Sequence, residues 1–176
     1  MRGRIRTQRK TLLAIGEGDT EVAFLKHVRS LYCSDNFGVS MTIKNANGRG
    51  PDNVINHVVR SSKQASYDRQ LCLLDTDINW SDKIVKVAKI HRISLIGSTP
   101  CMEGLLLLIL GEKVPDQSAN CKKILQQLTK NDMSEVNHYK THFPKQHLDT
   151  VRQEISVLNE LLMMIEGSTL SLKKTK

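Results

Sequence analysis

Short apolar runs alternate with stretches of helical periodicity through the first 110 residues of the chain. The runs typical of buried strands occupy residues 11–16, 39–44, 69–75 and 93–96. Strands and helices that alternate at these spacings are typical of a parallel sheet with helices on both faces. The sequence therefore predicts an α/β fold, Rossmann-like in type, around a mostly parallel four-stranded sheet.

The segments between these runs have the spacing and the end signals of helices. Residues 19–32 place their apolar side chains close to one helical face. Pro51 is suited to the first turn of the next helix, and Ser81 is suited to cap a helix that runs through Ile90. Residues 101–110 are apolar almost throughout, which predicts a helix that is buried nearly all round.

The pattern changes after Gly111. Residues 118–130 and 148–166 have helical periodicity, whereas 138–146 are polar and contain Pro144, which predicts a loop. We expect one domain with four parts. These are a basic arm (1–10), an α/β core (11–111), a helical C-terminal extension of the same domain (112–166) and a flexible basic tail (167–176).

The net charge of +8 favours an anionic partner, and five Arg or Lys fall within the first ten residues. Such a charge attracts nucleic acid, although ordinary solubilising charge is the alternative interpretation. Aromatic residues make up only 4% of the chain, so we expect contact with the phosphate backbone more than base stacking. The sequence shows no bilayer-spanning apolar run and no secretory signal, which predicts a cytoplasmic protein that does not enter a membrane.

Acidic residues follow two of the predicted strands. Glu17 comes directly after the first run, and Asp75 and Asp77 lie at the end of the third. Ligands of open parallel sheets bind beyond the carboxyl ends of the strands, so we expect Glu17 and Asp75 to project into one crevice. Carboxylates that serve only as helix-terminal or turn residues are the alternative.

Converging carboxylates repel one another and lose hydration unless a cation joins them. Mg²⁺ is a hard cation that takes one or two carboxylates, water and substrate phosphate oxygens, and Mn²⁺ is its common substitute. Two such ions can activate a water and stabilise the leaving oxygen of a phosphodiester. The sequence thus predicts metal-dependent phosphodiester chemistry, with Glu17, Asp75 and Asp77 as candidate catalytic residues.

Three motifs carry a family resemblance over roughly residues 11 to 111. They are EGDTE at 17–21, DTD at 75–77 and STPCME at 98–103, which opens the apolar helix. Together they resemble the TOPRIM domain. Among its branches they look most like the RloB-like proteins, which are related to the OLD-family nucleases of bacterial defence systems. Relatives often carry bulky aromatics after the third motif, where this chain has Met102 and Gly104-Leu105.

The resemblance implies roles for five acidic residues. Glu17 corresponds to the first TOPRIM glutamate, a general acid/base or metal ligand, and Asp75 and Asp77 correspond to the metal-binding pair. Glu21 and Glu103 match further acidic positions and would be secondary metal ligands or would support the ligands. The chain has no GxxxxGK[ST] motif, so an ATPase that works beside it would be a separate partner. A homodimer is the other arrangement left open.

Four further residues are candidates for contact with nucleic acid. Arg49, Lys140 and Lys145 are cations in polar segments, and Ser98 begins the third motif at a helix N-terminus that suits an anion. The alternatives are solvated surface charges and, for Ser98, a helix cap. Tyr139 and Lys140 also match a Tyr-Lys segment of the RloB-like proteins.

Three functions remain in competition at this level. The first is a Mg²⁺-dependent nuclease that acts on DNA or structured RNA, in bacterial or phage defence. The second is a non-catalytic TOPRIM-like module that binds nucleic acid or an ATPase. A receiver-like phosphoacceptor domain ranks below both, because the fourth strand ends in Gly-Ser-Thr-Pro and lacks the lysine expected there.

Overall fold

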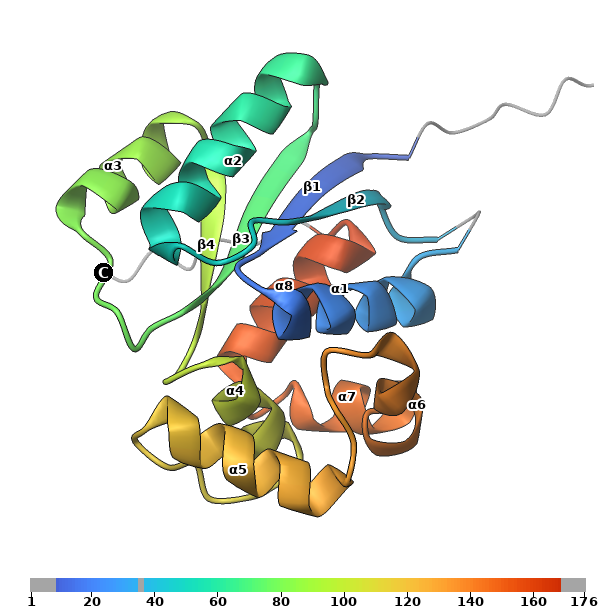
Figure 1. Cartoon of the computed structure of the whole chain (residues 1–176). Coiled ribbons are helices and arrows are strands. Elements are labelled where there is room, and N and C mark those ends of the chain that lie inside the picture. Colours follow the sequence, from blue (N-terminus) through green and yellow to red (C-terminus); the bar gives the residue numbers. More distant parts are fainter. Residues whose placement is uncertain (1–8, 35–36, 169–176) are drawn as a thin grey trace, which may run out of the picture.

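A computed structural model, which describes residues 9–34 and 37–168, has one sheet of four parallel strands (Figure 1). The strands are β1 (Thr11–Gly16), β2 (Ser40–Asn45), β3 (Arg69–Asp75) and β4 (Ile93–Ser98), in the order β2-β1-β3-β4. Every neighbouring pair is parallel. The predicted α/β fold is confirmed, and the order makes β1 and β3 adjacent central strands.

Helices cover both faces of the sheet and continue beyond it. The first group comprises α1 (Asp19–Tyr32), α2 (Gly50–Gln64), α3 (Asp82–Ile90) and α4 (Met102–Ile109). The C-terminal group comprises α5 (Ser118–Thr129), the short 3-10 helix η1 (Val136–His138), α6 (Tyr139–His142), α7 (Lys145–Val151) and α8 (Ser156–Glu166). Helices α2 and α3 pack on one face of the sheet, α1 and α8 pack on the other, and α4 and α5 lie beyond the carboxyl end of β4 (Figure 1). No helix in the described ranges combines the length and apolar character needed to cross a bilayer.

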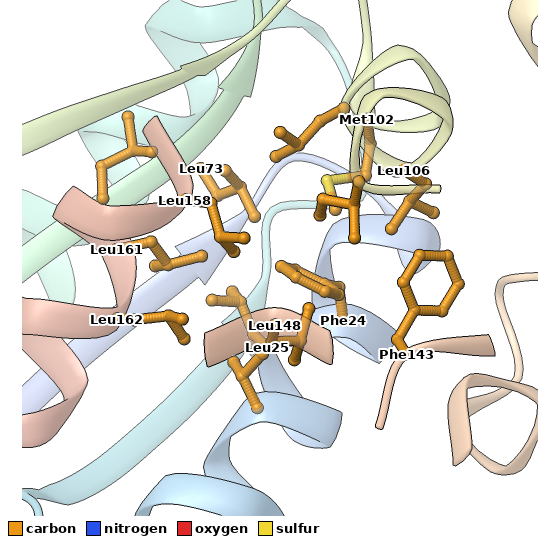
Figure 2. Close-up of a cluster of buried hydrophobic side chains, with 14 of the residues drawn as sticks. Phe24, Leu25, Leu73, Met102, Leu106, Phe143, Leu148, Leu158, Leu161 and Leu162 are labelled. Carbon is orange, nitrogen blue, oxygen red and sulfur yellow. The ribbon is translucent and has the colours of Figure 1, made fainter. Parts of the chain in front are cut away.

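Two apolar cores form because side chains of a strand alternate between the faces of the sheet. On β1, Leu12 and Ala14 join the larger core, whereas Leu13 and Ile15 join the smaller one under α2 and α3. The larger core extends from the sheet into the C-terminal helices, as Phe24, Leu106, Phe143, Leu158 and their neighbours show in Figure 2. The C-terminal helices therefore belong to the same folded unit as the sheet.

Glycine at the end of β1 lets α1 approach the sheet closely. A Cβ atom on Gly16 would lie 2.8 Å from Cβ of Glu21 and 3.0 Å from the backbone nitrogen of Val22. Distances this short leave no room for a side chain. The glycine thus brings the first turn of α1, with Glu21, against the tip of the sheet.

The predicted loop over residues 138–146 is wrong, because this segment contains α6 and the start of α7. The segment is ordered because its aromatic residues pack into the core. Tyr139 and Phe143 are fully buried, with ring centroids 5.4 Å apart, and His27 makes a 2.7 Å hydrogen bond to the Phe143 carbonyl. Pro144 comes directly before α7, where its missing N–H costs nothing.

The single helix predicted over residues 148–166 is also wrong, because the chain turns between α7 and α8. Arg152 begins this turn and is almost fully buried. Its guanidinium donates to both carboxylate oxygens of Glu166 at 2.7 and 2.9 Å and to Asn159 Oδ1 at 2.9 Å. These tertiary bonds define an αα corner that helical periodicity does not reveal.

Replacing Arg152 by alanine is expected to lower the free energy of unfolding by about 3 kcal/mol, because the partly buried Glu166 loses its bidentate partner. Urea denaturation monitored by circular dichroism measures the change. Lys145→Ala is the matched control, since Lys145 pairs with Asp149 at an exposed i,i+4 site worth about 0.3–0.5 kcal/mol. Equal effects of the two substitutions would contradict a structural role for the buried pair.

The other boundaries follow the prediction closely. The Ser81 hydroxyl accepts from the backbone nitrogen of Ile84, which confirms the predicted cap of α3. Most of the predicted N-terminal arm and C-terminal tail, residues 1–8 and 169–176, lies outside the described residues.

Candidate carboxylate site

The ends of β1 and β3 bring Glu17 and Asp75 together, as predicted from their positions at the carboxyl ends of two strands. The backbone nitrogen of Glu17 donates to the carbonyl of Leu73 at 3.2 Å and so continues the ladder beyond β1. The side chain of Glu17 then turns toward β3, where its Oε2 accepts from the backbone nitrogen of Asp75 at 3.3 Å. One carboxylate therefore lies directly over the tip of the neighbouring strand.

Asp75 is held from its other side by the start of α4. Its Oδ1 accepts a 2.8 Å hydrogen bond from the backbone nitrogen of Met102, the first residue of that helix. The Met102 side chain is buried in the larger core, which anchors this donor (Figure 2). The positive end of the helix dipole thus faces the Asp75 carboxylate.

Two glutamates from the surrounding helices complete the group. Glu21 is buried on α1, and its Oε2 accepts from the backbone nitrogen of Gly18 at 2.9 Å. Glu103, in the first turn of α4, accepts from the Thr20 hydroxyl at 3.3 Å. We call Glu17, Glu21, Asp75 and Glu103 the carboxylate cluster.

Burial and mutual repulsion disturb the protonation of this cluster. Burial raises the pKa of Asp75 to about 8, and the negative charges of Glu21, Glu17 and Glu103 add to the increase. Burial also raises the pKa values of Glu17 and Glu21. Within the described part of the chain, no member of the cluster forms an ion pair with Lys, Arg or His. The cluster must therefore keep a proton or gain a cation near neutral pH.

Asp77 lies at the rim of the cluster. It is exposed, and its Oδ2 accepts a 2.7 Å hydrogen bond from the Ser118 hydroxyl of α5. Its backbone nitrogen donates to the Pro100 carbonyl at 2.9 Å. Its charge contributes to the raised pKa of Glu17, but it is not among the causes of the raised pKa of Asp75. The two aspartates of the DTD motif therefore have different surroundings.

The five predicted metal ligands do not form one coordination shell. Among residues 9–34 and 37–168, no three His, Cys, Asp or Glu side chains are arranged so that they could together hold a metal ion. The donor chemistry still fits Mg²⁺, which commonly takes only one or two protein carboxylates. Glu17 Oε1 and Asp75 Oδ2 accept no hydrogen bond from the described residues, whereas the other oxygen of each is engaged.

Of the residues predicted to contact nucleic acid, Arg49 lies beside the cluster and Ser98 is enclosed. Arg49 is exposed and directly follows Gly48, whose backbone nitrogen donates to the Glu17 carbonyl at 2.8 Å. Ser98 is fully buried, with its hydroxyl 3.6 Å from Met102 Sδ. In this structure Ser98 therefore offers no surface to a nucleic acid, because it packs under the start of α4.

The two predicted lysine contacts lie in different surroundings. Lys140 is exposed on α6, next to the buried Tyr139. Lys145 pairs with Asp149 at 2.6 Å and lies 4.4 Å from the ring centre of Tyr32, at the C-terminal end of α1. The rise of an α-helix places Tyr32 roughly 16 Å along α1 from Glu21. Lys145 is thus separated from the cluster by most of a helix.

Two residues beside the cluster were not predicted as part of the site. The Tyr139 hydroxyl donates to the Thr20 carbonyl at 3.2 Å, and burial together with the charges of Glu21 and Glu103 raises its pKa well above the ordinary value. The Thr20 hydroxyl bonds Glu103. The Tyr-Lys resemblance was the only signal for Tyr139, because its partner lies 119 residues away.

Comparisons with known proteins place the chain in a family without adding a characterised relative. No similar curated protein and no similar solved structure is found. A family model described as RloB-like protein matches residues 12–167. The match includes the sheet except for Thr11, the carboxylate cluster and every helix of the C-terminal group, and the chain belongs to the RloB-like family.

Proposed function

We propose that the chain is a metal-dependent nuclease that hydrolyses phosphodiester bonds of DNA or structured RNA. One observation carries the proposal: four carboxylates gather at the tips of β1 and β3 without a protein cation among the described residues, and the pKa of Asp75 rises to about 8. Clustered carboxylates with disturbed protonation are typical of functional sites. A fold alone would not require such a cluster.

Glu17 and Asp75 would hold Mg²⁺ or Mn²⁺ through the oxygens that accept no hydrogen bond from the described residues. The bound metal would supply charge for the phosphate oxygens and for the attacking water. Burial raises the pKa of Glu17, which makes its carboxylate a stronger base for a proton of the attacking water. The Met102 nitrogen fixes the Asp75 carboxylate, and Glu21 and Glu103 add negative charge around it.

Family membership and the motif resemblance support the same class of activity. The TOPRIM-like motifs at 17–21, 75–77 and 98–103 lie together at one end of the sheet. The net charge of +8 suits a polyanionic substrate. We extend the proposal to a defence role beside a separate ATPase on the strength of the OLD-family resemblance.

A non-catalytic module that binds nucleic acid is the second candidate. The observation in its favour is that no three potential ligands in the described ranges could jointly hold a metal ion. Isothermal titration with Mn²⁺ distinguishes the candidates. Binding at millimolar or lower metal that is lost in Glu17→Gln supports the nuclease, and no binding supports the module.

A cutting assay tests the proposal directly. We expect the wild-type chain to cut at least one of plasmid DNA, single-stranded DNA and bulk tRNA with Mg²⁺ or Mn²⁺ and to be inactive in EDTA. Glu17→Gln should lower the rate by about 10²-fold or more, because it removes a charge and a general base. Asp19→Asn is the matched control, since Asp19 is exposed two residues away and bonds Asn45 instead.

The proposal would be contradicted if cutting persisted in EDTA. It would also be contradicted if Glu17→Gln and Asp19→Asn lowered the cutting rate equally. Gel analysis of the products also identifies the substrate class. Circular dichroism of each variant checks that the fold is retained.

A further inference from the structure

A pocket of about 260 Å³ lies directly beside the carboxylate cluster. Thr20 and Glu103 form the wall that it shares with the cluster, where the Thr20 hydroxyl bonds Glu103. The rest of the lining comes from α5 and the segment after it, through Lys122, Gln126 and Met133 among others. The helical C-terminal extension thus builds a cavity onto the site that the strand ends define.

The lining has two kinds of surface. Leu125 and Met133 supply an apolar part of the lining, with only 2% and 5% of their surfaces exposed. Gln126 is exposed, and its amide has no hydrogen-bond partner among the described residues, while Lys122 forms no ion pair with them. Asp132, also in the lining, is already engaged through Oδ1 by the backbone nitrogen of Ser134 at 2.9 Å.

We propose that this pocket receives one unstacked nucleobase of the nucleic acid whose backbone lies on the carboxylate cluster. The inference rests on the proposed function and specifies its substrate as a strand with an unpaired or extruded base. The base ring would pack against Leu125 and Met133, the Gln126 amide would bond its edge, and Lys122 would contact the adjoining phosphate.

Size and position favour a single base over other ligands. The volume falls below the roughly 300 Å³ at which pockets for drug-sized ligands begin, so a stacked run of bases does not fit. Glu103 belongs to both the cluster and the pocket, so a strand could reach both at once. An amide beside an apolar surface suits a base edge and ring better than it suits a bare phosphate.

Repeated residue types in α5 provide matched controls. Gln126 and Lys122 line the pocket, whereas Gln127 and Lys123 are their exposed neighbours and do not. Fluorescence anisotropy in EDTA would measure binding of labelled single-stranded homopolymers of each base. Abasic oligomers of the same length report backbone contact alone.

We expect the wild type to bind at least one base-containing oligomer about 10-fold more tightly than the abasic one, as one buried base is worth about 1–3 kcal/mol. Gln126→Ala should remove most of this preference, and Gln127→Ala should keep it. Lys122→Ala should weaken binding of both oligomers. It should also reduce the slope of the logarithm of the binding constant against the logarithm of the salt concentration by about one, whereas Lys123→Ala should have a smaller effect.

Equal affinity for base-containing and abasic oligomers, or equal behaviour of Gln126→Ala and Gln127→Ala, would overturn the pocket assignment. Because binding is measured in EDTA, the result does not depend on catalysis, and repulsion between the metal-free cluster and the backbone affects both oligomers alike. A base preference in a chain that cuts nothing would support the pocket and reject the nuclease. Metal-dependent cutting without a base preference would reject the pocket and support the nuclease.

Discussion

Asp75→Asn is expected to lower metal-dependent cutting by about 10²- to 10³-fold without unfolding the chain. Asparagine keeps an oxygen that can accept from the Met102 nitrogen, so the contact between β3 and α4 survives. The substitution removes the negative charge that a metal at the strand tips would need. Losses of this size are typical when one preorganised electrostatic group is removed from an active site. Initial rates with saturating Mn²⁺ measure the effect.

Asp77→Asn provides the graded comparison within the same motif. Asp77 is exposed and bonds the Ser118 hydroxyl, so we expect a loss of only about 10-fold, of the size seen when supporting contacts of a metal site are removed. Equal losses for the two variants would mean that both aspartates bind the metal directly. Full activity of Asp75→Asn would exclude Asp75 from the chemistry.

The strands of the sheet were predictable from sequence because each one is marked by the apolar pattern of its own residues. Residues 69–75 form a nearly continuous apolar run, and the structure has β3 with the same bounds. The positions of Glu17 and Asp75 at strand ends also predicted that they would meet, because the carboxyl ends of neighbouring parallel strands lie at the same edge of the sheet. The ends of α7 and α8 were not predictable, because the Arg152–Glu166 pair that defines the corner is tertiary.

Much of the site depends on contacts between residues distant in sequence. Thr20 meets Glu103 across 83 positions and Tyr139 across 119. No periodicity or spacing encodes such contacts, so the pocket on α5 could not be inferred before the structure. The burial of Ser98 has a similar cause, because only the packing of α4 shows that its hydroxyl faces the Met102 sulfur.

In EDTA, the cluster is expected to make the wild-type fold less stable as the pH rises from 5 to 8. The pKa of Asp75 is raised in the folded chain to about 8, above its ordinary value of 3.8, so folding favours the protonated form. The stabilising contribution is complete below the unfolded pKa and disappears as the pH passes the folded value. We expect a loss of roughly 2–4 kcal/mol, since one pKa unit is about 1.4 kcal/mol and solvent at the half-buried carboxyl screens part of it.

The difference in unfolding free energy between wild type and Asp75→Asn removes the titrations of groups outside the carboxylate cluster. His27 acts in the opposite direction, because burial lowers its pKa and stability then rises with pH, but it contributes to both proteins. Urea denaturation at several pH values should show the wild type losing stability relative to Asp75→Asn from pH 5 to 8.

Addition of Mg²⁺ then tests whether a bound cation can replace the proton on Asp75. A cation that binds only the folded cluster stabilises it in proportion to the logarithm of its concentration. Millimolar Mg²⁺ should therefore restore the stability of the wild type at pH 8 and leave Asp75→Asn nearly unchanged. A wild type whose pH dependence matches that of the variant would show that Asp75 is ionised throughout this range. If the wild type loses stability with pH as expected but does not respond to Mg²⁺, the cluster is a proton-binding site, and the non-catalytic module is favoured.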